Sequence, residues 1–298
     1  MTDERSYGSP NAFRRALTDR LRAVAREGRW DLAQLQRQMA YDRLLERLYF
    51  VDDGWIVKGA AALLARELGV RASIDLDVYL AKAGEVAERQ LRDAAARDIG
   101  DWFRFAVGPN QPASDGSHGL RLPVVASVGA TVWARFHVDL VGSEIVMTGT
   151  PEDVPPLVRV AIPDVEQHGY RAYPLVDHIA DKVAAMFQRY GEQEQPSTRF
   201  RDLVDLVAII SGATVEASAQ TTALRSEEQR RRITLPQQFD VPDRNTWEGG
   251  YAREANASLL PGAKTLDEAL GVVRPFIDPL LQRSATGHWN PGSARWDQ

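Results

Sequence analysis

The chain has 298 residues with a net charge of −5, and a single hydrophobic core stops growing at about 250 to 300 residues, so two lobes are expected. The absence of cysteine excludes disulfides, thiolate catalysis and Cys-based zinc sites, and the acidic balance (36 Lys+Arg against 41 Asp+Glu) argues against a general nucleic-acid coating protein. The amino terminus lacks the apolar core of a signal peptide and no apolar run reaches about 18 residues, so we expect a cytoplasmic protein without a membrane partner.

The first half of the chain mixes helices and strands. Helix-spaced apolar residues over 10–48 predict two or three helices. The following elements are predicted in order: a strand at 55–58, a helix at 60–68, a strand at 73–80, a helix at 85–97, a strand at 102–107, a loop at 108–119, and β-rich runs at 119–128 and 130–141. The break at Gly129 between the last two runs predicts a hairpin.

The second half is predicted to be mostly helical. Residues 148–165 are proline-rich and irregular, and are expected to bridge the two lobes. Helices are predicted at 177–190, 198–211, 215–232, 246–259 and 265–282. We therefore expect three parts: amino-terminal helices and a core over 1–165, a helical carboxy-terminal lobe over 166–285, and a mobile, turn-rich tail over 286–298.

Carboxylates with strand spacing are the first chemical signal. Asp75 and Asp77 are two positions apart in a predicted strand, so they point to the same face. Asp139 lies in a run where alternation puts Trp133, Arg135, His137 and Asp139 on one face. A neighbouring strand could thus complete a three-carboxylate site, although a solvated sheet face remains the alternative. Such a site suits Mg²⁺, or Mn²⁺, because these ions take oxygen ligands and keep substrate phosphates in their shell.

Two further segments offer groups that could bind nucleotide phosphates. Gly59, preceded by Lys58, opens a predicted helix whose first amide groups could hold a triphosphate, while a simple chain reversal is the alternative. Lys182 lies at the edge of an apolar helical stripe, where it could neutralise phosphates or extend along the surface. Asp205 is three residues after Asp202 in an apolar helix, so it needs a cationic partner, for which Lys182 is our candidate.

These motifs in order resemble one known family. The segments KGAAAL, SIDLD, the later strand aspartate, DKVAAM, RFRDLVDL and FDVPDRNTWEGGYAREA are similar to those of AbiEii-type nucleotidyltransferase toxins, which include the MenT-like toxins. The resemblance spans roughly residues 10–285. It implies an α+β fold, with a DNA polymerase β-like nucleotidyltransferase core of mixed sheet and flanking helices, and a helical carboxy-terminal lobe.

The resemblance also implies roles for individual residues. Asp75, Asp77 and Asp139 match the metal-binding acidic positions, and Lys182 and Asp205 match the remaining catalytic ones. Lys58, Gly59, Ser73 and Lys182 are candidate nucleotide-binding residues, with Mg²⁺ as cofactor and a nucleoside triphosphate as substrate. The family's usual second glycine and hydroxyl are replaced here by Gly59-Ala60-Ala61. Ser73 is also a candidate regulatory point, since a phosphoryl group there would repel a triphosphate.

The acceptor lies outside these motifs. MenT-like members modify the 3′ end of tRNA and block its charging, so the resemblance implies tRNA as the acceptor and a cognate antitoxin protein as a partner. Candidate RNA contacts are Arg199, Arg201, Arg230, Arg231 and Arg232. Two alternatives stay open: transfer to a protein or small molecule, and a non-catalytic nucleotide-binding regulator.

Overall fold

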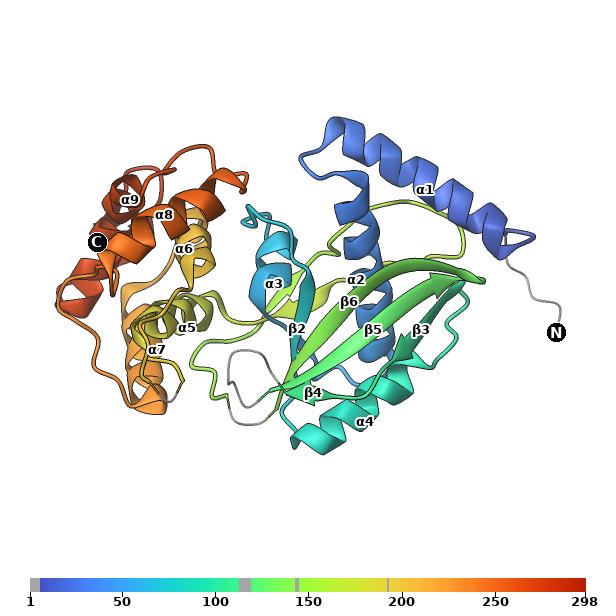
Figure 1. Cartoon of the computed structure of the whole chain (residues 1–298), viewed down its shortest axis with the longest axis horizontal. Coiled ribbons are helices and arrows are strands. Elements are labelled where there is room, and N and C mark those ends of the chain that lie inside the picture. Colours follow the sequence, from blue (N-terminus) through green and yellow to red (C-terminus); the bar gives the residue numbers. More distant parts are fainter. Residues whose placement is uncertain (1–5, 113–118, 143–144, 192) are drawn as a thin grey trace. The chain divides into compact units, whose positions relative to one another are not determined.

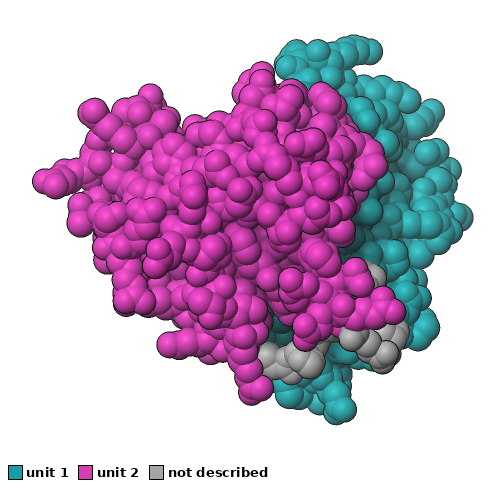
Figure 2. Space-filling model, turned by 60° about the vertical axis from the view of Figure 1, so that its left-hand side comes forward, with its two compact units in different colours: residues 1–66, 72–145, 153–172 teal, residues 67–71, 146–152, 173–298 magenta. Residues whose placement is uncertain are grey.

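The computed structural model describes residues 6–112, 119–142, 145–191 and 193–298. The chain divides into two compact units (Figure 2). The core unit, shown in teal, comprises Met1–Arg66, Ala72–Ile145 and Asp153–Ala172, and the helical unit, shown in magenta, comprises Glu67–Arg71, Val146–Glu152 and Tyr173–Gln298. The units thus divide later than the predicted boundary at 165, and two short earlier segments belong to the helical unit.

A mixed sheet forms the centre of the core unit (Figure 1). Its strands within the described residues are β1 (Ile56–Val57), β2 (Asp75–Tyr79), β3 (Phe103–Val107), β4 (Gln111–Pro112), β5 (Leu120–Val128), β6 (Thr131–Val141), β7 (Glu152–Val154) and β8 (Tyr170–Ala172). The order is β3-β5-β6-β2-β1-β8-β7, and β4 pairs with β5. The pairs β2–β6 and β1–β8 are parallel, whereas β1–β2, β3–β5 and β5–β6 are antiparallel. The predicted mixed sheet is therefore confirmed, with β4 in the predicted loop at 108–119, whose residues 113–118 lie outside the described part.

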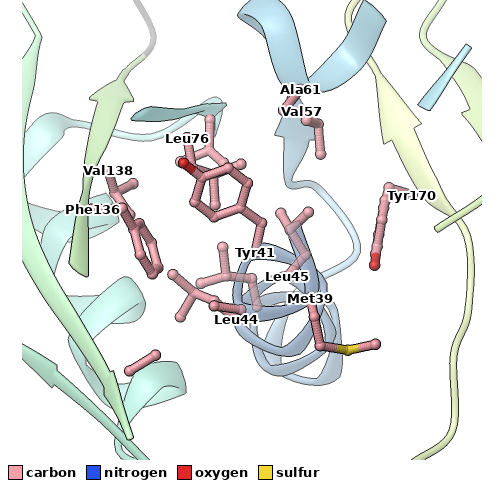
Figure 3. Close-up of a cluster of buried hydrophobic side chains, with 14 of the residues drawn as sticks. Met39, Tyr41, Leu44, Leu45, Val57, Ala61, Leu76, Phe136, Val138 and Tyr170 are labelled. Carbon is pink, nitrogen blue, oxygen red and sulfur yellow. The ribbon is translucent and has the colours of Figure 1, made fainter. Parts of the chain in front are cut away.

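The helices of the core unit are α1 (Pro10–Glu27), α2 (Leu32–Val51), α3 (Gly59–Ala65) and α4 (Gly84–Ala95). A capping box between Asp31 and Gln34 starts α2 by satisfying amides that have no partner within the helix. Tyr41 extends from α2 toward the sheet, where its ring centroid lies 4.8 Å from that of Phe136 on β6 (Figure 3). Leu76 and Val138, from β2 and β6, join this buried cluster, so one face of the sheet is apolar.

A β-bulge interrupts the hairpin of β5 and β6. The turn is at Gly129 as predicted, with a φ of +60°, and Val128 pairs with Thr131. Ala126 pairs with Ala134 and Ser127 with Val132, so Trp133 has no opposite residue. The bulge breaks the strict alternation of faces. The prediction that Trp133 shares a face with His137 and Asp139 is therefore wrong, and its indole Nε1 instead donates to the carbonyl of Gln36 in α2.

The helical unit contains α5 (Leu175–Phe187), α6 (Phe200–Gly212), α7 (Ala217–Arg231), α8 (Arg244–Asn256) and α9 (Leu266–Leu281). Each overlaps a helix predicted from the sequence. The Trp247 indole donates to the carbonyl of Ser197 over 2.9 Å, and Gly250 leaves room for the ring of Phe200, which a Cβ atom there would approach to 2.3 Å. The segment WEGGY thus fixes the start of α6. Within the described residues, no helix is both long and apolar enough to span a bilayer.

The carboxy-terminal segment ends in a small hairpin of β9 (His288–Asn290) and β10 (Arg295–Asp297). Trp289 is almost completely buried, and its indole donates to the carbonyl of Ile210 over 2.8 Å. Phe276 of α9 contacts both Trp289 and Trp296, with centroid distances of 5.1 and 5.0 Å. Residues 286–298, predicted from the sequence to be a mobile tail, are therefore packed through their aromatic side chains. The prediction failed because two tryptophans seven residues apart form no helix or strand periodicity.

Candidate active site

Three carboxylates lie on one face of two neighbouring strands. Strands β2 and β6 are parallel, with Asp77 opposite Asp139 and Asp75 opposite His137. The intervening residues Leu76 and Val138 are buried against the helix-covered face, so the carboxylates are on the other face. All three are only partly exposed. The strand pairing thus brings Asp139 next to Asp75 and Asp77, which are more than sixty positions earlier in the sequence.

Arg121, which the sequence analysis did not identify, connects two of these carboxylates. Its Nη2 atom lies 2.8 Å from Oδ1 of Asp75, and its Nη1 atom lies 2.8 Å from Oδ2 of Asp139. The Arg121 side chain is 18% exposed. Burial alone would lower the pKa of Arg121, but the hydrogen bond to Asp75 and the charges of Asp139 and Asp75 raise it above its ordinary value. The guanidinium is therefore a fixed positive charge within the acidic face.

The bulge in the hairpin decides where Arg121 points. If the pairing of Val128 with Thr131 continued without interruption, Arg121 would face Val138, whose side chain is in the core. The extra residue, Trp133, shifts the register by one position and pairs Arg121 with Asp139 instead. The alternation of apolar and polar residues in a sequence does not show where a bulge shifts the register of a strand. The sequence offers one clue to Arg121, which is the single charged residue in the apolar run LRLPVV.

The donor set fits a hard divalent cation, because carboxylate oxygens are the ligands that Mg²⁺ prefers. Three carboxylates lie on this face, and the guanidinium of Arg121 offsets part of their negative charge. Among the described residues, no group of three or more His, Asp or Glu side chains is already arranged around a common point for a metal. Asp75 and Asp139 are held instead by Arg121, so a cation would share carboxylate oxygens with this side chain.

Gly59 makes room for the third carboxylate. It has a φ of +58°, and a Cβ atom there would lie 1.9 Å from Oδ2 of Asp77. The Lys58 amide donates to the carbonyl of Asp77 over 2.8 Å, which fixes the start of α3 beside β2. Lys58 itself is buried, with 8% exposure. The predicted glycine turn is thus adjacent to the acidic face, and the glycine is required for both its backbone conformation and its contact with Asp77.

Ser73 lies just before β2 rather than within it. Its hydroxyl donates to the carbonyl of Asp75, and its own carbonyl accepts from the Tyr41 hydroxyl over 3.3 Å. Ser73 is buried, with 8% exposure. The side chain therefore ties the chain at the entry to β2, and a modifying enzyme would need this segment to open.

A second ionic cluster lies in the helical unit. Lys182 on α5 is buried, and its Nζ atom lies 2.8 Å from Asp202 and 2.7 Å from Asp205, both on α6. The predicted pairing of Lys182 with Asp205 is therefore confirmed. Burial alone would lower the pKa of Lys182, but the charges of Asp202 and Asp205 outweigh it and hold the pKa above its ordinary value. Lys182 remains a cation with two acidic partners.

Two arginines complete this cluster. Arg71, in the segment Glu67–Arg71 of the helical unit, makes a bidentate pair with Asp205 at 2.9 and 2.8 Å. Arg199 lies 2.6 Å from Asp202. Burial alone would raise the pKa of Asp205, but Lys182 and Arg71 hold it well below its ordinary value. Three cations thus surround two carboxylates. Arg71 was missed because it is distant in sequence from the helices that it contacts.

The predicted RNA-contacting arginines differ in exposure. Arg231 is mostly buried and pairs with Asp181 and Glu227 at 2.5 and 2.8 Å. Arg230 pairs with Glu227 at 2.6 Å, and Arg201 with Glu254 at 3.0 Å. Arg232 is exposed at the carboxyl end of α7. Arg199 belongs to the Lys182 cluster described above. The residues therefore do not form one uniform basic patch.

The candidate residues are divided between the two units. The core unit contains Lys58, Gly59, Ser73, Asp75, Asp77 and Asp139. The helical unit contains Lys182, Arg199, Arg201, Asp205, Arg230, Arg231 and Arg232.

Comparison with known proteins now identifies the family. The model of the AbiEii nucleotidyl transferase toxins of type IV toxin–antitoxin systems matches residues 43–278, which include every candidate residue above. No curated protein matches the chain. MenT4, a nucleotidyltransferase toxin from Mycobacterium tuberculosis H37Rv, has a similar fold, with a TM-score of 0.52 and 16% identity over 86% of this chain and 99% of that one. JHP933 from Helicobacter pylori aligns with a TM-score of 0.46 and 17% identity over 83% of this chain and 94% of that one. Because the family model covers most of its length, this chain belongs to the AbiEii nucleotidyltransferase toxins of type IV toxin–antitoxin systems.

Proposed function

We propose that this toxin transfers a nucleotide from a nucleoside triphosphate to the 3′ end of tRNA, and that Asp75, Asp77 and Asp139 hold Mg²⁺ on a DNA polymerase β-like core. The observation that carries the proposal is the alignment of these carboxylates on β2 and β6 in a nucleotidyltransferase. When bound, the cation would neutralise triphosphate oxygens and lower the pKa of the attacking hydroxyl.

The reaction makes one bond and breaks one. The acceptor hydroxyl oxygen attacks the α-phosphorus, the bond between that phosphorus and the oxygen bridging to the β-phosphorus breaks, and pyrophosphate leaves. Asp139 lies opposite Asp77 on the adjacent strand and is proposed to accept the hydroxyl proton. Asp75 and Asp77, fixed by the parallel pairing with β6, would hold the cation that neutralises the triphosphate, so most of the rate enhancement would come from positioning and electrostatics.

Within the helical unit, the Lys182 cluster is proposed to bind phosphate. The cluster contains three positive charges, on Lys182, Arg71 and Arg199, and two negative charges, on Asp202 and Asp205. The surplus charge favours an anion. Lys182 is buried and satisfied by both aspartates, whereas Arg71 and Arg199 are more exposed, at 22% and 38% of their side-chain surface. We assign phosphate contact to the two arginines and the positioning of both aspartates to Lys182.

Family membership implies an antitoxin partner, and tRNA is proposed as the acceptor because MenT-like toxins act on it. A transfer assay tests the acceptor directly. Purified protein is incubated with Mg²⁺ and each α-labelled nucleoside triphosphate, with and without total tRNA. Label on the 3′ end of tRNA is expected, together with its loss in an Asp77→Asn variant.

The same assay separates the alternatives. Label on protein or on a small molecule, with none on tRNA, would replace the proposed acceptor. Triphosphate binding without transfer would favour a regulator, as the altered Gly59-Ala60-Ala61 turn allows. Each outcome leads to a different function for the same acidic face.

A further inference from the structure

The position of Arg121 extends the proposed metal site. Its Nη2 atom donates to Oδ1 of Asp75 over 2.8 Å, and its Nη1 atom donates to both oxygens of Asp139, over 3.1 Å to Oδ1 and 2.8 Å to Oδ2. These two carboxylates are also proposed metal ligands. The carboxylate oxygens that accept hydrogen bonds from the guanidinium have fewer lone pairs available for a metal, and the positive charge of the guanidinium repels a cation placed beside it. Arg121 and a divalent cation therefore cannot both keep their full contacts to Asp75 and Asp139.

We propose that Arg121 is the resident counter-ion of this acidic face, which competes with the divalent cation for Asp75 and Asp139 and is displaced from at least one of them when the cation binds. The inference rests on the proposed metal site. Without a counter-ion, three carboxylates on two adjacent strands would repel one another, so Arg121 offsets this repulsion between β2 and β6 before a metal enters.

The released guanidinium has a second use. A displaced Arg121 would remain next to the cation and the triphosphate, where a planar guanidinium binds phosphate oxygens in a bidentate manner. Its charge is retained throughout, because an arginine guanidinium is not deprotonated in proteins. Metal entry would thus make a phosphate-binding group available beside the bound cation. Arg121 is accordingly a positioning residue in the metal-free protein.

Mn²⁺ binding in the absence of nucleotide and acceptor tests the competition. Electron paramagnetic resonance measures free Mn²⁺ with wild-type protein, Arg121→Gln, Arg121→Lys and a matched control, Arg104→Gln. Arg104 is a strand arginine of the same unit whose partner, Asp98, is outside the site. We expect Arg121→Gln to bind Mn²⁺ about tenfold more tightly than wild type, since the repelling charge is gone. Arg121→Lys should lie between them, because it keeps a positive charge on this face but replaces the two separate guanidinium contacts with one shorter ammonium side chain, and Arg104→Gln should match wild type.

Thermal unfolding supplies an independent readout. In chelator, Arg121→Gln should unfold at a lower temperature than wild type, and saturating Mg²⁺ should raise its midpoint by more than it raises that of wild type. A variant that folds only with Mn²⁺ supports the proposal. If Arg121→Gln stays unfolded with Mn²⁺, Arg121→Lys decides: affinity equal to that of wild type would overturn the competition.

Failure of the inference is distinguishable from failure of the proposed function. Mn²⁺ binding that Asp139→Asn abolishes but Arg121→Gln leaves unchanged would overturn the competition and retain the metal site. Mn²⁺ binding that is insensitive to Asp139→Asn would overturn the metal site and with it the competition. Because no nucleotide is present, neither result depends on whether tRNA is the acceptor.

Discussion

The carboxylate of Asp77 lies against the backbone of Gly59, at a point where any Cβ atom on residue 59 would come within 1.9 Å of Oδ2 of Asp77. The residue that opens α3 therefore decides the position of an acidic group on β2. The altered Gly59-Ala60-Ala61 turn retains the one glycine that this contact requires.

Gly59→Ala should abolish transfer by displacing the Asp77 carboxylate. The matched control is Gly100→Ala, since Gly100 also has a positive φ, +84°, but a Cβ atom there meets nothing within 4 Å. Gly100→Ala should lose about 1 kcal/mol of unfolding free energy from backbone strain, and Gly59→Ala should lose more, because its Cβ atom also collides with the Asp77 carboxylate. Only Gly59→Ala should lose activity, as measured by labelled transfer alongside urea denaturation. Equal activities in the two variants would show that the contact with Asp77 is dispensable.

Lys182→Met should destabilise the helical unit by roughly 3 to 5 kcal/mol, because it leaves Asp202 and Asp205 buried with less compensation. Arg201→Met serves as the control, since the Arg201–Glu254 pair is on the surface and should be worth less than about 1 kcal/mol. Urea denaturation followed by far-UV circular dichroism gives both values. A small effect of Lys182→Met would mean that Arg71 and Arg199 suffice to balance the aspartates.

Ser73→Asp should reduce transfer and toxicity strongly, because a carboxylate beside Asp75 would repel the triphosphate and replace a buried hydroxyl that donates to the Asp75 carbonyl. Ser73→Ala, which removes only the hydrogen bond, should retain most activity. Growth inhibition and transfer assays compare the two. Full activity of Ser73→Asp would exclude Ser73 as a regulatory point.

Arg232→Glu should weaken tRNA binding without a measurable change in stability, because Arg232 is exposed at the end of α7. Arg231→Glu should instead lower stability, since it places a third acidic group beside Asp181 and Glu227. Gel-shift affinity and the thermal midpoint, measured on both variants, separate the effects. Unchanged affinity in Arg232→Glu would remove it from the proposed acceptor surface.

Stability should fall as the pH rises from about 4 to 7, owing to Asp42. Burial raises its folded-state pKa to about 7, despite hydrogen bonds from Tyr170 and the amides of Leu157 and Val158 that lower it, whereas an unfolded aspartate has a pKa of about 3.9. The folded state thus binds more protons in this window and loses that advantage as Asp42 ionises. Asp42→Asn should be less stable overall but show a flatter profile in urea denaturation across this range. Parallel profiles for the two proteins would rule out Asp42 as the source.

The sequence could predict what depends on local periodicity. Each helix of the helical unit overlaps one predicted from the sequence, although the one at 215–232 was predicted as a polar helix, and the strand pair around Gly129 was predicted from its turn. Asp75 and Asp77 were placed on one face because a strand alternates sides with every residue. Asp205 was assigned a cation because a carboxylate within DLVDLV is too costly to bury alone, and Lys182 proved to be that partner.

Only the tertiary structure decided what depends on register and distant contacts. Trp133 occupies a bulge that no alternation pattern reveals, and the resulting shift pairs Arg121 with Asp139 rather than Val138. Arg71 contacts Asp205 across a sequence separation of 134 residues. The sequence by itself determined the acidic residues and their strands, because those follow from local rules. The positions of Arg121 and Arg71, which balance the acidic residues, depend on strand pairing and on the path of the chain. These are determined by the free energy of the whole fold rather than of any one segment.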